Sequence, residues 1–382
     1  MTTKRATTSS RIRVLHAIRQ GQIGGGESHV IDLVQTLDPT RYESMVLSFT
    51  DGPMVERMNS LGVKVFVIPT NRPFDFRTWR AVRQLMKDEC IDVLHAHGTR
   101  ANSNTFYSAR KLKIPIVYTV HGWSFHPDQQ PAVHKFRVLS EKYLVKNSDC
   151  TICVSQSNLN DGMKRFPMDR ATVVKPSVNL EKFNPDADFH PVRSEFGIND
   201  DQVLVGYIVR MTKQKDPITL VRAIELLPAD LPVKFLFVGD GELKTEVVNL
   251  VHTLGLTNKI IFSGFRQDVP HILNAIDIYC LPSLWEGLPI GVLEAMAMRK
   301  AVIASAVDGT QEVIQDNLNG LLITKQSPEQ LAGALTTLIN NRFIRSELGS
   351  AARDTIVKEF GVLNMARNIE QVYERVIGTT TK

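Results

Sequence analysis

The chain has 382 residues, of which 43% are hydrophobic and 22% charged, as in an ordinary folded protein. This length favours two domains over one. No stretch approaches the ~20 apolar residues that a membrane-spanning helix requires, and the four cysteines argue against a chain built on disulfide bonds. We therefore expect no membrane-spanning helix, and the cysteine count argues against an exported protein built on disulfide bonds.

The two halves of the chain carry opposite net charge. Residues 1–185 contain 26 Lys and Arg against 16 Asp and Glu, a net charge of +10, whereas residues 186–382 contain 19 against 24, a net charge of −5. The basic half suggests an anionic partner, either phosphorylated lipid, a membrane surface or nucleic acid. Its basic residues are scattered and no recognition motif is present, so we expect no nucleic acid. Unequal charge without a function is the alternative.

Short apolar runs alternate with helical patterns along the first half. Residues 1–10 lack the apolar core of a signal peptide, and we expect a disordered leader there. Helical patterns include Ser28–Leu37 and Phe76–Cys90. The predicted strands are Arg11–Ile18, Ser44–Phe49, Val63–Ile68, Val93–His95, Ile116–Val120 and Thr151–Val154. This alternation predicts a parallel sheet with helices on both faces.

A glycine-rich segment, Gly24-Gly25-Gly26-Glu27, lies between the first predicted strand and the first predicted helix. Glycines allow the backbone to approach a ligand closely, and the start of a helix offers N–H groups to an anion. The segment lacks the GxGxxG spacing of a dinucleotide site. We interpret it as a candidate anion contact, with a simple tight turn as the alternative.

Three histidines lie at or near strand ends in the same half. His95 and His97 are separated by one residue, so their side chains point to one face of a strand. No matching carboxylate cluster accompanies them, and we interpret both as structural and predict no metal site. His121 lies in the loop after a later strand, where it either contacts a sugar or acceptor or is itself structural.

Two further features of the first half involve cysteines and arginines. Cys150 and Cys153 have CxxC spacing, but they lie in an apolar strand-like run without a second pair, so we predict that they are core residues. Arg77, Arg80 and Arg83 recur at helical spacing among aromatic residues. That pattern fits either a helix on a membrane surface or a solvated helix face with its aromatic side chains packed inward.

The second half repeats the strand and helix alternation after a proline-containing boundary at residues 184–191. Its predicted strands are Val203–Val209, Val233–Val238, Lys259–Ser263, Ile276–Leu281, Ala301–Ala304 and Gly320–Ile323. We predict an α/β protein of two Rossmann-like domains, residues 11–185 and 186–361, whose parallel sheets face each other across a ligand cleft. A helix within residues 362–382 is expected to cross back to the first domain.

Two cations follow the first predicted strand of the second half. Arg210 and Lys215 are five residues apart in a strand-to-helix loop, so both can reach one diphosphate. Arg offers a planar fork and Lys a point charge, and such cations stabilise charge that develops on a leaving group. A solvated basic loop is the alternative.

A pair of carboxylates lies in Trp285–Ala297, where a strand-like run leads through a turn into a helix. Glu286 is predicted in the turn and Glu294 about two helical turns further on. In open α/β sheets ligands bind at the carboxyl ends of strands. The two carboxylates and the N–H groups of the helix start would hold one elongated polar ligand. The alternative is one buried turn and one solvated glutamate.

Taken in order, these segments resemble a family 4 glycosyltransferase of the GT-B fold, over nearly the whole chain. The motifs that carry the resemblance are Gly24-Gly25-Gly26-Glu27, Thr119-Val120-His121-Gly122, Arg210 with Lys215, Val238-Gly239-Asp240-Gly241, Phe262-Ser263-Gly264-Phe265, and Glu286 with Glu294. Residues 175–179 and Leu288-Pro289 depart from the forms common in the family, which leaves the donor sugar open.

The resemblance implies a role for each motif. Glu294 would bind the nucleotide ribose, Arg210 and Lys215 the diphosphate, Glu286 the donor sugar, and His121 would line the sugar site. The implied catalytic residues are His121, Arg210, Lys215 and Glu286. The implied donor-binding residues are Gly24, Gly25, Arg210, Lys215, Arg266, Glu286, Gly287, Leu288 and Glu294, with Arg266 near the base.

The implied reaction moves a sugar from a nucleotide-sugar donor, which we expect to be a UDP-sugar, to an acceptor hydroxyl with retention of configuration. The family generally uses no metal or other cofactor. We expect front-face attack, in which the leaving diphosphate helps to take the acceptor proton.

The first half also resembles members that build surface polysaccharides, especially at His95–Gly98 and Val120–His126. The acceptors of those members are often lipid-diphosphate-linked sugars at the cytoplasmic membrane face. We therefore expect a saccharide or lipid-linked acceptor and a cytoplasmic protein at the periphery of an anionic membrane. A nucleotide-sugar epimerase and a non-catalytic nucleotide-sugar-binding protein remain alternatives.

Overall fold

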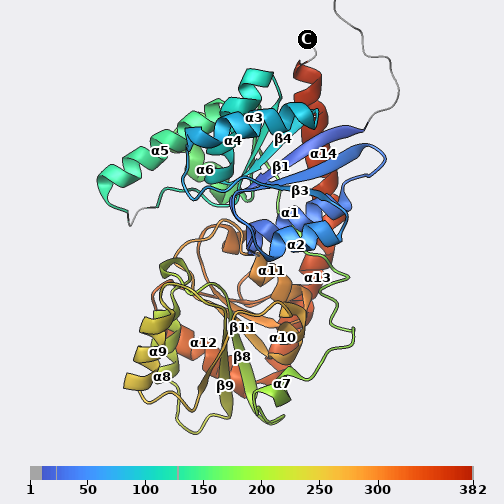
Figure 1. Ribbon diagram of the computed structural model, residues 1–382. Coiled ribbons are helices and arrows are strands. Elements are labelled where there is room, and N and C mark those ends of the chain that lie inside the picture. Colours follow the sequence, from blue (N-terminus) through green and yellow to red (C-terminus); the bar gives the residue numbers. More distant parts are fainter. Residues whose placement is uncertain (1–10, 23, 127–128, 381–382) are drawn as a thin grey trace, which may run out of the picture. The chain divides into compact units, whose positions relative to one another are not determined.

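The computed structural model describes residues 11–22, 24–126 and 129–380, so the expected leader at residues 1–10 lies outside the described chain. The chain forms two compact units (Figure 1). The first comprises residues 1–176 together with 362–382, and the second comprises residues 177–361.

Residues 177–185 belong to the second unit, although the sequence placed them in the first domain. Two contacts within the second unit account for this. The Val178 N–H donates to the Phe360 carbonyl at 2.9 Å, and Arg353 donates to the Phe183 carbonyl at 2.9 Å. The proline-containing stretch that served as the predicted boundary therefore lies just inside the second unit.

The first unit is built on a seven-stranded sheet in which all neighbouring strands are parallel. In sheet order the strands are β3 (Lys64–Val67), β2 (Tyr42–Ser48), β1 (Ile12–Ile18), β4 (Val93–His97), β5 (Ile116–Val120), β6 (Cys150–Cys153) and β7 (Ala171–Val173). The six predicted strands are present with small shifts of their ends. β7 was missed because three residues are too short to show a pattern.

Helices cover both faces of this sheet because alternate strand residues point to opposite sides (Figure 1). Leu15 and Leu94 pack on one face in a buried cluster with residues of α3 and α4, whereas Val14 and Val93 pack on the other face with residues of α1 and α14. The helices are α1 (Gly25–Thr36), α2 (Pro53–Ser60), α3 (Trp79–Asp88) after a 3₁₀ turn (Phe76–Thr78), α4 (Thr99–Leu112), α5 (Pro131–Lys146), α6 (Gln156–Met163) and α14 (Val362–Thr380). Cys150 and Cys153 are buried and unpaired, which confirms their prediction as core residues.

The last helix, α14, completes the first unit. Ile369 and Tyr373 are buried in the same cluster as Val14 of the central strand. The Tyr373 hydroxyl also lies 2.6 Å from His95 Nδ1. These contacts explain why residues 362–382 group with the first unit, far from it in sequence.

The second unit contains a six-stranded parallel sheet. In sheet order the strands are β10 (Ile260–Gly264), β9 (Val233–Val238), β8 (Val203–Ile208), β11 (Ile278–Leu281), β12 (Ala301–Ser305) and β13 (Leu321–Ile323). The helices are α7 (Val192–Glu195), α8 (Pro217–Glu225), α9 (Lys244–Thr253), α10 (Val269–Ala275), α11 (Ile290–Ala297), α12 (Pro328–Asn340) and α13 (Arg342–Glu359), with 3₁₀ turns at Lys213–Lys215 and Asp308–Glu312. All six predicted strands are present.

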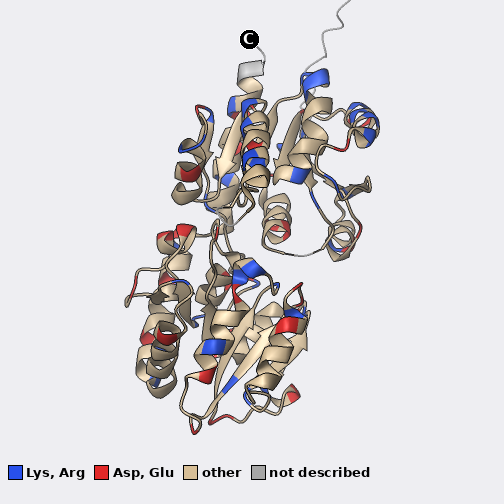
Figure 2. Ribbon diagram, turned by 90° about the vertical axis from the view of Figure 1, so that its left-hand side faces the viewer, with Lys and Arg blue, Asp and Glu red and all other residues tan. Residues whose placement is uncertain are grey.

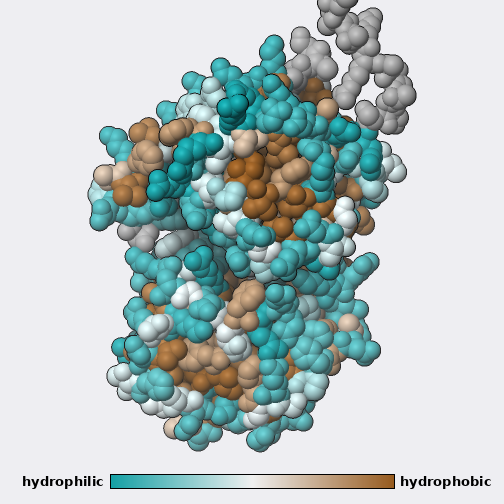
Figure 3. All heavy atoms as spheres, viewed as in Figure 1, coloured by the Kyte–Doolittle hydropathy of each residue, from teal (hydrophilic) through white to brown (hydrophobic). Residues whose placement is uncertain are grey.

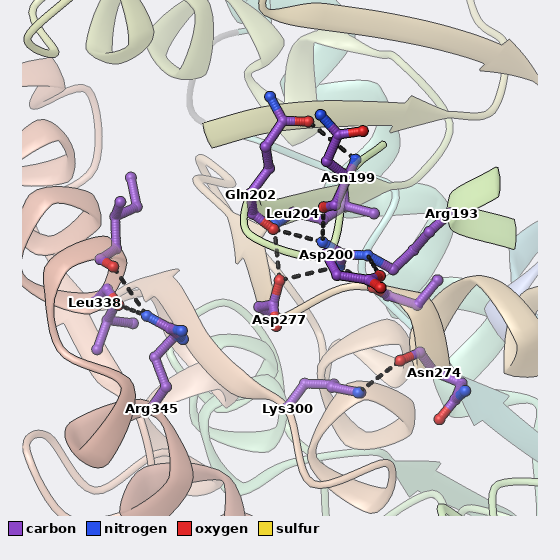
Figure 4. Close-up of polar contacts among 12 residues, drawn as sticks. Arg193, Asn199, Asp200, Gln202, Leu204, Asn274, Asp277, Lys300, Leu338 and Arg345 are labelled. Carbon is purple, nitrogen blue, oxygen red and sulfur yellow. Dashed lines mark hydrogen bonds and ion pairs between the residues drawn. The ribbon is translucent and has the colours of Figure 1, made fainter. Parts of the chain in front are cut away.

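The amino-terminal edge of the second sheet is tied together by Arg193 and Asp277 (Figure 4). Arg193 of α7 donates to the Ala275 carbonyl at 2.9 Å and pairs with Asp277 Oδ2 at 3.3 Å. The same carboxylate oxygen accepts the Leu204 N–H at 2.7 Å. Leu204 lies near the start of β8 and Asp277 directly before β11, so these contacts fix the two central strands whose other ends carry the candidate site.

Candidate functional site

The candidate site of the second unit lies where the strand order reverses. β8 pairs with β9 on one side and with β11 on the other, and the chain runs outward from each of them. Ligands of open α/β sheets bind outside the carboxyl ends of the strands at such a point. The loop after β8 carries Arg210 and Lys215, and the loop after β11 carries Glu286.

Lys215 and Glu286 form a largely buried ion pair across these two loops. Lys215 Nζ lies 2.5 Å from Glu286 Oε1, and the two side chains are only 21% and 5% exposed. Ser283 Oγ donates to the same carboxylate oxygen at 2.6 Å. The structure thus brings together two residues that the sequence placed 71 positions apart.

Groups that the sequence analysis missed hold this pair in place. Gln214 Nε2 donates to Glu286 Oε2 at 3.4 Å, and Asp308 Oδ2 accepts the Glu286 N–H at 2.9 Å. Gly309 packs so tightly that a Cβ there would lie 1.8 Å from the Gly287 carbonyl oxygen. No sequence spacing connects residues 308 and 309 with Glu286. Their proximity follows from the pairing of β11 with β12.

Arg210 lies in the loop after β8, and Glu294 lies in α11, which follows the loop that carries Glu286. Arg210 follows β8, is exposed, and makes no side-chain hydrogen bond or ion pair with the described residues. Glu294 is half-buried in α11, and Gly287 and buried Leu288 form the turn before that helix. The exposed guanidinium is therefore available to an anion that arrives from solvent.

Arg266, predicted near the nucleotide base, is engaged in a local ion-pair network. Its Nε and Nη2 donate to the two Asp268 carboxylate oxygens at 2.8 and 2.6 Å, and it also pairs with Glu195. The Arg266 guanidinium lowers the pKa of Asp268 to about 2. A ligand at this strand end would meet a neutralised network instead of an unpaired cation.

In the first unit the strand order reverses between β1 and β4, and the glycine-rich segment follows β1. Gly24 directly precedes α1, and its carbonyl accepts the Ser28 N–H at 2.9 Å. Gly24 and Gly25 are exposed, whereas the Glu27 side chain is buried and burial raises its pKa. A Cβ on Gly24 would lie 2.9 Å from Glu27 Oε2, so glycine leaves room for this carboxylate.

His121 lies in the loop after β5, beside two other histidines. Its Nε2 lies 3.3 Å from His97 Nδ1, and its ring meets the His29 ring edge-on with the centroids 5.1 Å apart. Burial lowers the pKa of His121 well below the usual 6.5, and the nearby His29 adds to this effect. His121 therefore presents a neutral imidazole at neutral pH.

Glu141 of α5 anchors the loop that carries His121. Its fully buried carboxylate accepts hydrogen bonds from Ser124 Oγ at 2.5 Å, Thr99 Oγ1 at 2.7 Å and the Tyr118 hydroxyl at 2.9 Å. Burial raises the pKa of Glu141. No pattern in the sequence indicates this contact, because a glutamate in a helix is usually solvated.

A hollow of about 620 Å³ lies at the opposite, amino-terminal edge of the first sheet. Residues that precede or begin β5, β6 and β7 line it, among them Pro115, Asp149 and Arg170. The strand ends that carry His121 and the glycine-rich segment are at the other edge, so this hollow takes no part in the candidate site.

Comparison with known proteins identifies the family. The family described as "Glycosyltransferase Family 4" matches residues 23–182, and "Glycosyl transferases group 1" matches residues 188–355. These two matches together span most of both units. The chain belongs to the family 4 glycosyltransferases. As a glycosyltransferase of this family, it uses a nucleotide-sugar donor.

This glycosyltransferase is similar to UDP-Gal:alpha-D-GlcNAc-diphosphoundecaprenol alpha-1,3-galactosyltransferase of Escherichia coli, with 24% identity over 96% of this chain and 98% of the relative. Its fold is similar to that of Anabaena Alr3699/HepE in complex with UDP-glucose, with a TM-score of 0.85 and 21% identity over 96% of this chain and 100% of the other. It is also similar to WaaG, a glycosyltransferase involved in lipopolysaccharide biosynthesis, with a TM-score of 0.76 and 16% identity over 94% and 99% of the two chains. The predicted GT-B fold is confirmed.

Proposed function

We propose that the protein transfers a sugar from a UDP-sugar to a hydroxyl of a lipid-linked saccharide, with retention of configuration, in the synthesis of a surface polysaccharide. The buried pair of Lys215 and Glu286 carries this proposal. It fixes an ammonium group and a carboxylate 2.5 Å apart at the strand-order reversal of the second unit. One group suits a diphosphate and the other suits sugar hydroxyls.

The charges of the second unit suit departure of a nucleoside diphosphate. Glu286 orients the Lys215 ammonium before substrate binds, so little reorganisation is needed as negative charge develops on the leaving group. The exposed Arg210 adds a planar fork that can bind two phosphate oxygens. Glu294 of α11 is the proposed ligand of the ribose hydroxyls.

Glu286 is better placed to bind hydroxyls than to attack the sugar. Lys215 and Ser283 both contact its Oε1, and Gln214 donates to its Oε2. These contacts reduce the nucleophilicity of the carboxylate and fix its direction. Front-face attack by the acceptor, with a diphosphate oxygen taking the proton, follows as the proposed course. The neutral His121 would hydrogen-bond a sugar hydroxyl.

The names of similar proteins support the proposed donor and acceptor classes. The Escherichia coli relative is named for UDP-Gal and for a GlcNAc-diphosphoundecaprenol acceptor, and the Anabaena protein was solved with UDP-glucose. A uridine donor and an acceptor joined to lipid through a diphosphate are therefore the first substrates to test.

Helix α5 is the proposed contact with the cytoplasmic face of an anionic membrane. Val133, Phe136, Leu139 and Tyr143 are 40%, 65%, 55% and 50% exposed, and their spacing of three or four residues places them on one side of the helix. Figure 3 shows a hydrophobic patch at the place where α5 lies in Figure 1. An exposed aromatic and aliphatic stripe of this kind suits the interface between headgroups and acyl chains.

Basic residues accompany the apolar stripe of α5. Lys135, Lys142 and Lys146 are exposed and recur at spacings of seven and four, so they form one flank of the stripe. Figure 2 shows Lys and Arg spread over the helices of the first unit. Among the described helices, none is both long enough and apolar enough to span a bilayer. Surface binding through α5 would bring the protein to a lipid-linked acceptor without such a span.

The arginine-rich helix α3 fits a membrane surface less well than α5. The Trp79 ring stacks on Tyr107 with the centroids 4.4 Å apart, so this aromatic residue packs inward. Phe76, in the turn before α3, is 73% exposed, so only part of the expected aromatic set is packed. Arg77 pairs with Asp75 at 2.7 Å, which neutralises one of the three arginines.

The transfer reaction is tested by nucleoside diphosphate release. UDP-, GDP- and ADP-sugars are supplied with and without a lipid-diphosphate-sugar acceptor, to the wild type and to Glu294→Ala and Lys215→Ala. We expect acceptor-stimulated release of UDP from one donor, lost in both variants. Conversion of the sugar without acceptor would indicate an epimerase, and donor binding without release would indicate a non-catalytic binding protein.

Membrane binding is tested separately by sedimentation with vesicles of anionic or zwitterionic lipid. We expect binding to anionic vesicles that weakens with salt, and at least tenfold weaker binding for Phe136→Ser/Leu139→Ser. Phe265→Ser/Leu318→Ser, which replaces two exposed apolar residues of the second unit, is the matched control. Equal binding by both double variants would contradict a role for α5.

A further inference from the structure

Five histidines gather at the carboxyl edge of the first sheet. They come from four separate parts of the unit: His16 from β1, His29 from α1, His95 and His97 from β4, and His121 from the loop after β5. Neighbouring ring centroids lie between 4.0 and 5.8 Å apart. From the sequence we predicted no metal site at His95 and His97, because no carboxylate cluster accompanies them, and we assigned His121 separately to the sugar site.

Several ring nitrogens of this cluster are buried without a hydrogen-bond partner. Among the described residues, neither nitrogen of His16 or of His29 has a partner, and Nε2 of His97 has none. The exposed fractions of these three side chains are 0%, 2% and 2%. A buried polar atom normally has a partner in the protein, a water or an ion. The unpartnered nitrogens therefore point to a ligand among these rings.

In the part of the chain that the structure describes, two sets of three histidines have ring nitrogens within 4.8 Å of one another: His16, His95 and His97, and His29, His97 and His121. The first set is unsuitable because both His95 nitrogens already contact hydroxyls, that of Tyr373 at 2.6 Å and that of Thr119 at 2.7 Å.

The second set fits a metal ion better. Two nitrogens bound at 2.0–2.1 Å to one tetrahedral ion lie roughly 3.3 to 3.4 Å apart, and His97 Nδ1 lies 3.3 Å from His121 Nε2. A ring nitrogen of His29 lies within 4.8 Å of a ring nitrogen of each of these two histidines. His121 is only half-buried, so it leaves a path by which an ion can enter.

We propose that His29, His97 and His121 bind one divalent transition-metal ion of the zinc class, with the fourth coordination position open to water. Three imidazoles without a carboxylate favour zinc, nickel, copper or cobalt over magnesium and calcium, which prefer oxygen ligands. Burial lowers the pKa of His29 to about 4 and the pKa values of His97 and His121 well below 6.5, so no proton needs to be displaced at neutral pH.

The ion takes no part in sugar transfer, and its effect would be inhibitory. The ion would coordinate the imidazole of His121, which in the proposed reaction hydrogen-bonds a sugar hydroxyl. Ligand histidines usually donate their second ring N–H to a carboxylate or carbonyl, and neither ring nitrogen of His29 has a hydrogen-bond partner among the described residues. We therefore expect binding about 10- to 100-fold weaker than at a site with such partners, and hence a reversible ion.

The test uses the full-length protein, without a histidine tag and stripped with a chelator, titrated with Co²⁺ and then Zn²⁺. We expect one Co²⁺ per chain, visible absorption bands of a tetrahedral ion, and displacement by Zn²⁺, all measured without substrate. His29→Gln and His97→Gln should each weaken binding at least 10-fold. His16→Gln, which removes a neighbouring ring outside the chosen set, should keep the affinity, as should the exposed control His252→Gln.

A ligand exchange separates loss of the site from loss of folding. His29→Cys keeps a metal-binding atom, so it should retain Co²⁺ and add a thiolate-to-cobalt charge-transfer band in the near ultraviolet. Absence of Co²⁺ bands in the wild type, or equal affinity in His29→Gln and wild type, would overturn the proposal. Equal loss in His16→Gln and His29→Gln would overturn the choice of ligands. None of these readouts depends on sugar transfer.

Discussion

The two units have the same kind of sheet and the same kind of strand-order reversal, but they place opposite chemistry there. In the second unit a cation and a carboxylate, Lys215 and Glu286, are joined at 2.5 Å and supported by further hydrogen bonds. In the first unit neutral histidines lie together. Buried ring nitrogens of His16, His29 and His97 have no hydrogen-bond partner among the described residues. The pair in the second unit is held by protein groups, whereas we propose that a bound ion completes the histidine cluster of the first unit. This difference suggests that charge stabilisation is fixed in one unit and recognition is adaptable in the other.

The largest effect should come from breaking the ion pair of the second unit. Lys215→Met removes the cation that faces the leaving group and leaves the Glu286 carboxylate buried without its partner, so we expect kcat to fall about 10³-fold. Single-turnover release of nucleoside diphosphate measures the rate of sugar transfer. Lys213→Met, which removes an exposed lysine two residues away, should change kcat less than threefold. Comparable losses in the two variants would mean that the loop, and not the ion pair, supports the reaction.

The neutral histidines of the first unit should make its stability depend on pH. Burial lowers the pKa of His16 to about 3 and that of His29 to about 4, below the unfolded value of 6.5. The unfolded chain therefore binds more protons between these values, so stability is complete above pH 6.5 and falls as the pH is lowered. At pH 5 the two residues together should lower the free energy of unfolding by about 4 kcal/mol relative to pH 7.

Urea unfolding at pH 5 and pH 7 measures this effect. Trp79 and Trp123 report on the first unit when Trp285 of the second unit is replaced by Phe. His16→Gln should remove about 2 kcal/mol of the pH difference, and the exposed His252→Gln should remove none. A pH difference that His16→Gln leaves intact would show that this histidine is not held neutral by the fold.

Glu294→Gln tests whether Glu294 contributes to donor binding, whereas Lys215 contributes to the rate of transfer. Glu294 lies in α11, and its proposed role is to hold ribose hydroxyls. Loss of its charge should raise the KM for donor about 10- to 100-fold and leave kcat within threefold, because ground state and transition state lose the same contact. A fall in kcat as large as that of Lys215→Met would contradict this division between binding and catalysis.

The sequence predicted the sheets and the charged site much better than the histidine cluster. Strand patterns repeat at short range, so they are visible in the sequence. The strand β7 was not predicted, because it has only three residues. Lys215 and Glu286 were predicted as site residues because each follows a strand, but their contact with each other was not predicted. Asp308, His16 and His29 belong to other elements and reach their sites only through sheet pairing and helix packing. Glu141 was missed because nothing in a helical pattern marks a buried carboxylate.

The smallest effect is expected for Glu141→Gln, which is compared with the same substitution at Glu286. Glu141→Gln and Glu286→Gln each replace a buried carboxylate with an amide of nearly the same shape. Glu141 faces three hydroxyls, which can rotate to donate or accept, and burial raises its pKa. Its stability contribution is therefore complete below the unfolded pKa of 4.5 and declines as the pH rises through the folded value. The amide should change the free energy of unfolding at pH 7 by only about 1 kcal/mol and transfer by less than threefold.

Glu286→Gln keeps an oxygen that can accept from Lys215 but loses the negative charge that orients the ammonium, so it should cost about 10²-fold in kcat. Unfolding and transfer assays on the two variants compare the loss of kcat in Glu286→Gln with that in Glu141→Gln. Losses of equal size would mean that Glu141 works as an ion, and the edge of the first sheet would then depend on buried charge as the second does. A much larger loss in Glu286→Gln would mean that, of these two carboxylates, only the one in the second unit must be charged.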